Sequence, residues 1–286
     1  MKNSLLLLSF LLLIECSTEE RSAGSNGRNS SMISGTDSTT IKAEKNQIIA
    51  DQSNEGVCAK LIKHAILNKD SLRLQNLLDS GCNVNSIQRD SDNQPRYTAL
   101  NWATQSRSIN LVKFLLKNGA DPNIHLYRSP FPIQLASISD YPEEIFYELI
   151  KYDVDVNVRN GWIYCATPLA CAIESGSMDR ARKLIELGAV LYSDTSNFNE
   201  PPLYTAAFHG KWDFFKMLLQ EGANPNDKFS LGSEDCWPCP DGITILHTVC
   251  QEKDDSIVIK IIKELTSFGL DINIENNDGY NKDYHE

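Results

Sequence analysis

Apolar residues recur with helical spacing along much of the chain, in runs that close on a glycine. The clearest runs are INLVKFLLKNG (109–119), MDRARKLIELG (178–188) and KWDFFKMLLQEG (211–222). Apolar side chains return there every three or four positions, which predicts a helix with one buried face. We expect the closing Gly to end each helix, because it adopts left-handed backbone without steric cost.

A short turn-like string follows each such helix. GADPN (119–123) has relatives in GCNVN (81–85), DVDVN (153–157), GANPN (222–226) and GLDIN (269–273). Strings rich in Asn, Asp and Pro are typical of turns. The pattern predicts a helix stop followed by a hairpin-like loop, once in each repeated unit.

A second string opens a shorter helix in each unit. It reads TALNWA from Thr98, FPIQLA from Phe131, TPLACA from Thr167, PPLYTA from Pro201 and TILHTV from Thr244, at intervals of 33, 36, 34 and 43 residues. The same offset places a degenerate copy, KLIKHA, at residue 60. A Thr hydroxyl can cap free N–H groups at a helix start, whereas Pro has no N–H to leave unpaired.

These strings resemble the T-P-L-H-x-A signature of the ankyrin repeat, whose period is about 33 residues. The resemblance covers residues 56–286 and implies an all-α solenoid of about six helix-loop-helix repeats with hairpin-like connecting loops. A single unit cannot close a core, so neighbours must stack. We expect distorted loops in the third copy, where Asp153 replaces Gly, and in the fourth, which ends GAVLY.

The N-terminal segment predicts export. Residues 5–14 are apolar but too few to span a bilayer, which takes about 20 residues, so residues 1–16 are interpreted as a signal peptide. The segment resembles a spirochaete-type bacterial lipoprotein signal, which implies lipidation of Cys16, although Glu15 departs from the usual small residue. The alternative is an ordinary signal peptide cleaved near Ser17 or Ala23. Residues 17–55, rich in Ser, Thr, Asn and Gly, predict a flexible tether.

Charge and motifs narrow the function. The chain has 27 Lys and Arg against 38 Asp and Glu, and the net charge of -11 disfavours nucleic acid or an anionic lipid surface as main partner. We therefore expect membrane contact only through the lipid anchor. The sequence contains no GxSxG, HExxH or glycine-rich phosphate loop, so we expect neither an enzyme nor a cofactor or metal site. His247 occupies the signature His position and is interpreted as structural.

The eight cysteines divide into two kinds. Cys82, Cys171 and Cys250 fall at expected core positions, where we interpret them as packing thiols. Cys236 and Cys239 form CWPC within an insertion, DKFSLGSEDCWPCPDG (227–242), between the fifth and sixth copies. A loop-stapling disulfide is the favoured interpretation of this pair. Unpaired thiols, pairing with another Cys such as Cys165, redox activity and metal binding remain open.

The ankyrin resemblance also implies a binding surface. Partners of the family commonly lie along the concave face, which loop tips and the exposed side of each first helix form. Counting from each first position, with Trp237 added from the insertion, gives these candidate partner-binding residues: Tyr97, Gln105, Tyr127, Arg128, Tyr164, Glu174, Phe198, Phe208, His209 and Trp237. Aromatic residues are prominent among them, as in protein-binding hot spots.

The sequence thus favours a monomeric, non-catalytic protein–protein interaction scaffold, lipid-anchored in a bacterial cell envelope and facing the periplasm or the exterior. One alternative is an envelope thiol-disulfide or oxidative-stress protein that uses Cys236 and Cys239. Another is an exported effector that binds host proteins.

Overall fold

The computed structural model describes residues 55–89, 95–126, 129–159, 166–192, 201–229, 242, 244–249 and 255–274. All of them belong to the second of two units into which the chain divides, Lys45–Glu286. The elements in chain order are α3 (Glu55–Leu67), α4 (Ser71–Asp79), β1 (Gln88–Arg89), β2 (Pro95–Tyr97), α5 (Ala99–Gln105), α6 (Ile109–Lys117), α7 (Pro132–Ser137), α8 (Glu143–Leu149), α9 (Pro168–Ser175), α10 (Met178–Glu186), α11 (Pro202–Phe208), α12 (Trp212–Gln220), α13 (Ile245–Val249) and α14 (Asp255–Ser267).

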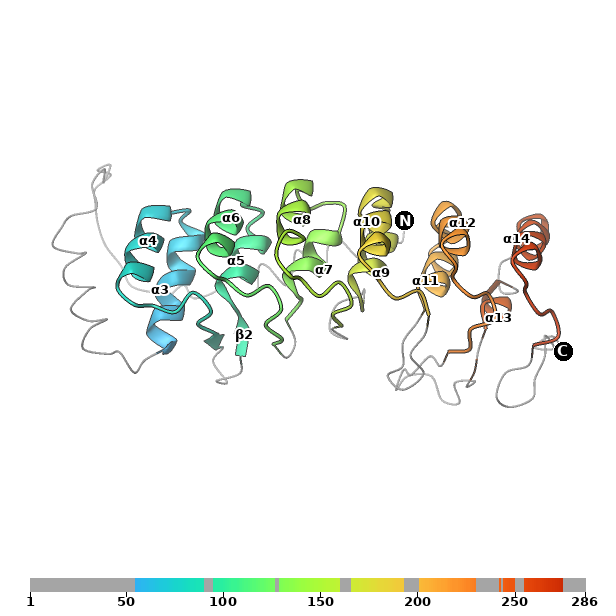
Figure 1. Cartoon of the computed structure of the whole chain (residues 1–286), viewed down its shortest axis with the longest axis horizontal. Coiled ribbons are helices and arrows are strands. Elements are labelled where there is room, and N and C mark those ends of the chain that lie inside the picture. Colours follow the sequence, from blue (N-terminus) through green and yellow to red (C-terminus); the bar gives the residue numbers. More distant parts are fainter. Residues whose placement is uncertain are drawn as a thin grey trace, which may run out of the picture. The chain divides into compact units, whose positions relative to one another are not determined.

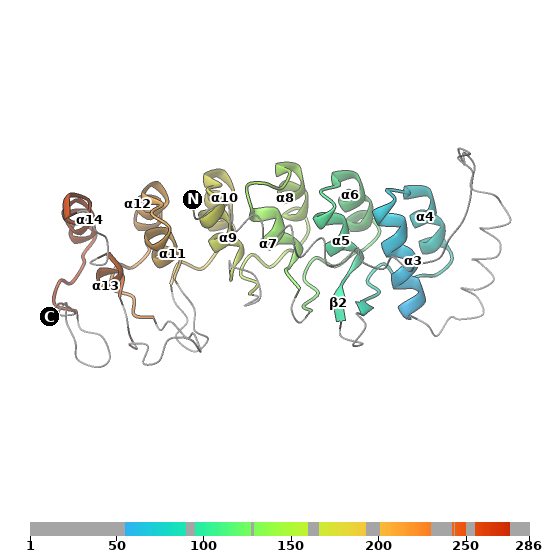
Figure 2. The ribbon, with the colours of Figure 1, turned by 180° about the vertical axis from the view of Figure 1, so that it is seen from behind.

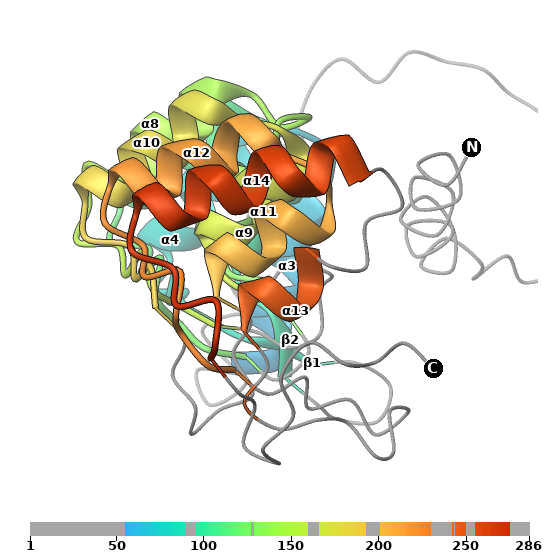
Figure 3. The ribbon, with the colours of Figure 1, turned by 90° about the vertical axis from the view of Figure 1, so that its right-hand side faces the viewer.

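Helices within this described part form six pairs, from α3–α4 to α13–α14, which follow one another in a row (Figures 1 and 2). The first helices of the pairs, here called inner helices, contact one another in succession from α3 to α13. Seen along the row, the second helices α8, α10, α12 and α14 lie in a separate layer from α9, α11 and α13 (Figure 3). Helix-loop-helix repeats stacked side by side confirm the predicted fold.

The inner helices begin where the TPLHxA-like strings begin. The Thr98 hydroxyl accepts the Asn101 N–H at 3.2 Å, and the Thr167 hydroxyl accepts the Ala170 N–H at 3.1 Å. α7 and α11 instead carry Pro in their first turn. α3 differs, since it starts at Glu55, upstream of the KLIKHA string, and is 13 residues long.

Small residues let the inner helices approach one another. The sixth position of the string is Ala in the first five copies, and each of these side chains is 0% exposed: Ala65, Ala103, Ala136, Ala172 and Ala206. The buried residues from Ile62 to Leu270 form one continuous core through all six pairs. Each pair therefore depends on its neighbours for burial of its apolar face, as stacked repeats require.

Side-chain amides join neighbouring repeats at the fourth position of the string. Asn101 Nδ2 donates to the carbonyl of Pro130 at 2.8 Å, and Gln134 Nε2 donates to that of Ala166 at 2.8 Å. Both carbonyls lie just before the next inner helix. In these copies an amide thus joins neighbouring repeats from the position that the signature assigns to His. The His247 side chain lies outside the described residues.

The GADPN-like loops form a ladder of hydrogen bonds from repeat to repeat. Asn85, the last residue of its string, donates to the Gly119 carbonyl at 3.1 Å and accepts the Asp121 N–H at 2.9 Å. Asn123, Asn157 and Asn226 each make the same pair of bonds to the following repeat. Gly119, at φ 84°, provides the left-handed helix stop that the sequence predicted. The terminal Asn of these four strings is therefore an inter-repeat connector.

The two loops expected to be distorted behave differently. The third copy keeps the ladder, because the Asp153 carbonyl accepts from Asn123 as a Gly carbonyl does elsewhere. The expectation was wrong there, since the bond uses only backbone atoms of residue 153. In the fourth copy Tyr192 occupies the Asn position and its side chain is 60% exposed. A phenol has a single hydroxyl, whereas an amide has a donor nitrogen and an acceptor oxygen that reach two backbone groups at once. The ladder is therefore interrupted between the fourth and fifth repeats.

The cysteines correct one prediction. Cys82 is buried as expected, but it forms a disulfide with Cys58 rather than packing as a thiol. The reason is the longer α3, whose first turns bring Cys58 to a Cα–Cα distance of 5.5 Å from Cys82. Cys171, 1% exposed, is also disulfide-bonded rather than a thiol, with its partner outside the described residues. Cys250 lies outside them too.

Candidate functional site: the inner-helix face

The inner helices and the loops that lead into them form the surface on which the sequence predicted partner binding. We call it the inner-helix face. Of the candidates, Tyr97, Gln105, Glu174, Phe208 and His209 are described. The others lie outside the described residues, as do the predicted lipidation and CWPC cysteines, so all of them stay predictions: Tyr127, Arg128, Tyr164, Phe198, Trp237, Cys16, Cys236 and Cys239.

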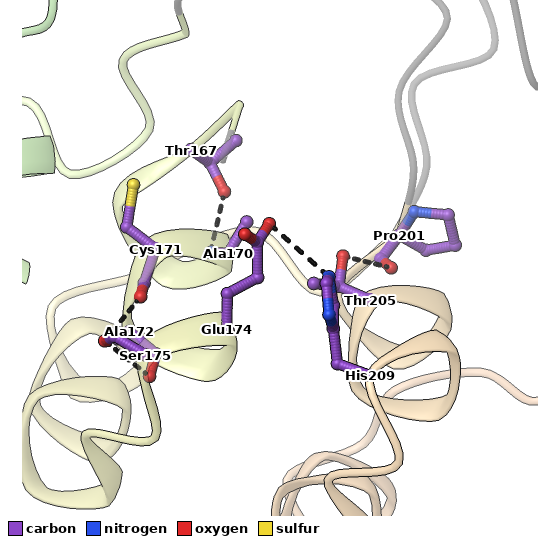
Figure 4. A network of polar contacts seen from close by, with 9 residues as sticks. All are labelled: Thr167, Ala170, Cys171, Ala172, Glu174, Ser175, Pro201, Thr205 and His209. Carbon is purple, nitrogen blue, oxygen red and sulfur yellow. Dashed lines mark hydrogen bonds and ion pairs between the residues drawn. The ribbon is translucent and has the colours of Figure 1, made fainter. Parts of the chain in front are cut away.

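Three predicted residues come together across α9 and α11. Glu174 reaches from α9 toward the His209 ring at the end of α11, with 3.9 Å between Glu174 Oε1 and His209 Nε2 (Figure 4). The Phe208 ring meets the His209 ring edge-on at 5.3 Å between centroids. Phe208 also stacks on Tyr204 at 5.6 Å and is still 65% exposed. We call Glu174, Tyr204, Phe208 and His209 the Phe208 patch.

The protonation of His209 sets the charge of this patch. Burial and, to a smaller extent, the positive charge of Lys211 lower the pKa of His209 below its usual value. The ring is therefore neutral at pH 7. Its approach to Glu174 becomes an ion pair only when the ring is protonated in more acidic solution. At neutral pH the patch therefore combines the Glu174 side chain with the exposed ring of Phe208.

A second aromatic cluster lies at the first two repeats. The centroid of the Tyr97 ring in β2 lies 4.7 Å from that of the Trp102 ring in α5. The Trp102 indole N–H donates to Gln88 Oε1 in β1 at 2.9 Å. The Lys63 ammonium of α3 sits over the Trp102 ring, 4.4 Å from its centroid. We call Lys63, Tyr97 and Trp102 the aromatic–lysine cluster. Gln105, half-buried at the end of α5, belongs to neither cluster.

Sequence reasoning found Tyr97 but missed Lys63 and Trp102. Trp102 occupies the fifth position of the string, which holds the buried residues Leu135, Cys171 and Thr205 in the following copies. A Trp at a position that otherwise takes smaller buried residues was the available signal, because an indole cannot be fully enclosed there. Lys63 follows from the contact of α3 with α5, which sequence spacing alone does not reveal.

The described part of the chain shows no feature of a metal centre or a membrane span. None of its His, Cys, Asp and Glu residues gather in threes that could hold an ion. No described helix is both long and apolar enough to cross a bilayer. Aromatic rings, a carboxylate and an ammonium on packed helices can bind another molecule by contact and charge.

Comparison with known proteins agrees with this geometry. Residues 133–229 match the family model of ankyrin repeats in three copies, and residues 96–125 match that of the single ankyrin repeat. An ankyrin repeat protein of Rickettsia felis is 30% identical over 118 residues, which cover 38% of this chain and 48% of that protein. An ankyrin repeat protein of fowlpox virus is 28% identical, with 57% of this chain and 82% of the relative covered.

Solved structures show the same fold. The ankyrin repeat domain of Bcl-3 superimposes with a TM-score of 0.59 at 19% identity, covering 77% of this chain and 91% of that one. The ankyrin repeat domain of human ASB11 gives a TM-score of 0.52 at 21% identity, covering 77% and 88%. The chain spans 48%, 36% and 28% of the lengths of three of its curated relatives. With its repeats, its stacked helix pairs and these matches, the chain is an ankyrin-repeat protein.

Proposed function

We propose that this chain is a non-catalytic scaffold of a bacterial cell envelope that captures another protein on its inner-helix face. Its membership of the ankyrin-repeat proteins supports binding rather than catalysis, because such repeats generally serve as protein interaction scaffolds. The identity of the partner, the envelope location and the lipid anchor at Cys16 all belong to the proposal.

The observation that carries the proposal is the Phe208 patch. Phe208 keeps 65% of its side chain exposed although it stacks on Tyr204, which is itself buried. A large aromatic ring held in place at its base and open on its other side offers contact area with little entropy left to lose. Such anchors supply most of the affinity in protein interfaces.

The disulfides support the exported location. Cys58–Cys82 joins a partly buried cysteine to a buried one within the first repeat, and Cys171 is oxidised as well. Disulfides persist in oxidising compartments and are rare in the reducing cytosol. Together with the signal-like apolar run at residues 5–14, they favour a site of action beyond the inner membrane.

Crosslinking capture from the envelope of the native organism tests the function. Phe208→Ala should lower the yield of crosslinked partner at least about tenfold, because truncating a hot spot costs about 2 kcal/mol or more. Leu72→Ala is the matched control, since Leu72 lies on α4, the second helix of its pair, and is similarly exposed, at 61%. Cys16→Ala in the same experiment should move the protein from the membrane to the soluble fraction.

Equal capture by wild type and Phe208→Ala would reject the inner-helix face as the binding surface. Retention of Cys16→Ala on the membrane would reject the lipid anchor while leaving the binding function standing. A thermal transition unchanged by Phe208→Ala would show that any loss of capture is not a loss of fold.

A further inference from the structure

The aromatic–lysine cluster of Lys63, Tyr97 and Trp102 carries the positive charge of an ammonium, which the Phe208 patch lacks at neutral pH. It combines side chains from α3, β2 and α5, at the start of the row of repeats (Figure 1). The Trp102 ring is held on one side by Tyr97 and fixed in orientation by its hydrogen bond to Gln88. The cluster is therefore a preorganised surface rather than a set of mobile side chains.

Among the described residues, Lys63 has no anionic partner. Within the described residues its ammonium contacts the Trp102 ring and forms no ion pair. Half-burial removes part of its water shell and lowers the pKa of Lys63. A cation–π contact offsets only part of that loss. A carboxylate that approached the ammonium would restore the missing charge interaction.

The surrounding repeats reinforce this preference. Residues 56–120 hold nine of the 27 Lys and Arg of the chain but only four of its 38 Asp and Glu. The basic residues are Lys60, Lys63, Lys69, Arg73, Arg89, Arg96, Arg107, Lys113 and Lys117. Residues 121–286 carry the opposite excess, so the first two repeats form a basic end on an acidic chain. A long polyphosphate would be repelled by the remainder, whereas a short acidic segment meets only the basic end.

We propose that the aromatic–lysine cluster receives an acidic segment of the protein partner, whose Asp or Glu carboxylate pairs with Lys63. An apolar side chain next to that carboxylate packs on the part of Trp102 that remains exposed. This inference rests on the proposed function and specifies the chemistry of the partner at one end of the inner-helix face. Charge-assisted hydrogen bonds of this kind are the stronger class in proteins.

Fluorescence anisotropy with a defined probe tests the inference. The probe is a fluorescein-labelled peptide of repeated Glu-Gly-Phe units, compared with peptides in which Gln or Lys replaces Glu, and with a duplex DNA oligonucleotide. The full-length protein should prefer the Glu peptide. Lys63→Gln should weaken that binding about tenfold, and Lys63→Arg should retain most of it. Lys117→Gln removes the same charge from an exposed site on α6, the second helix of its pair, and should change binding less than about twofold.

Several outcomes would overturn the inference. Equal binding of the Glu and Gln peptides would do so, as would equal losses in Lys63→Gln and Lys117→Gln. DNA binding that depends on Lys63 in the same way would make the site a general polyanion site. If sedimentation velocity showed a dimer that Lys63→Gln dissociates, the occupant of the cluster would be a second copy of the chain, and the inference would be wrong. Loss of partner capture in Phe208→Ala, with no effect of Lys63, would leave the proposed function intact and reject only this inference.

Discussion

At the scale of single residues, two positions in each loop decide how well neighbouring repeats are joined. The terminal Asn carries the ladder, and the residue two positions earlier fixes the turn: the carboxylate of Asp121 accepts the N–H of Asn123 at 2.8 Å. Asp155 and Asn224 do the same in their own loops. The fourth loop has Val190 and Tyr192 at these positions. Neither side chain can make the corresponding bonds, so this joint has fewer hydrogen bonds than its neighbours.

Restoring both residues should stabilise the protein. The double variant Val190→Asp, Tyr192→Asn is expected to raise the free energy of unfolding by about 1–2 kcal/mol, since a net hydrogen bond contributes about 1 kcal/mol. The new amide would reach the Gly222 carbonyl and the Asn224 N–H, the equivalents of Gly119 and Asp121 in the second loop. Urea unfolding followed by circular dichroism measures the change. Tyr192→Ala, which removes the exposed ring without adding bonds, should stay within about 0.5 kcal/mol; equal stability of the two variants would contradict the ladder.

At the scale of elements, one buried cation holds a turn that lacks the usual helix stop. α7 ends at Ser137 and the chain takes extended backbone at Ile138, with no Gly before α8. Arg180, which is 5% exposed on α10, donates to the carbonyls of Ala136 at 2.9 Å and Tyr141 at 2.6 Å, and also to that of Ile138. The guanidinium thus takes up carbonyls that a regular turn would pair within itself. Burial lowers the pKa of Arg180, but the group keeps its charge at neutral pH.

Arg180→Met should therefore destabilise the protein by about 2–4 kcal/mol, because it leaves several buried carbonyls without donors at about 1–3 kcal/mol each. Arg182→Met is the matched control on the same helix. Arg182 is half exposed, and its ion pair with the similarly exposed Glu221 is long, at 3.8 Å between Nη1 and Oε1. Its loss should therefore cost less than about 1 kcal/mol. Thermal and urea unfolding of both variants compare them directly. A similar loss in each would mean that Arg180 acts through its charge rather than through the turn.

The helices themselves were predictable, because their starts and stops are local. Thr98 and Thr167 cap the helices that their strings predicted, and Gly119 ends α6 as expected. Contacts between repeats were not predictable in the same way. The fixed spacing shows which positions meet, but not which hydrogen bonds, ring contacts or disulfides their side chains form. Cys58 lies upstream of the first aligned copy, so no repeat position pointed to its disulfide. Trp102 and Arg180 break the pattern of their positions, and only packing shows the result.

At the scale of the whole molecule, the array is a row of units that each rely on their neighbours, and the first unit has a neighbour on only one side within the row. The Cys58–Cys82 disulfide compensates for this by closing α3 onto the loop after α4, across 24 residues of sequence. A loop of that length reduces the entropy of the unfolded chain by an amount that corresponds to about 3.5 kcal/mol. The stabilisation is concentrated in the repeat that also carries Lys63.

The double variant Cys58→Ala, Cys82→Ala should consequently unfold from one end. Ala suits residue 82, because the same loop position is Ala in three other copies, at Ala120, Ala189 and Ala223. Hydrogen exchange followed by mass spectrometry should show loss of protection in α3 and α4, with α11 and α12 little changed, since repeat arrays lose structure unit by unit. A uniform loss along the array would contradict this view. Because α3 positions the ammonium over Trp102, the same variant should also weaken binding of the Glu peptide. The disulfide of the first repeat would then control the charge that the inner-helix face offers to a partner.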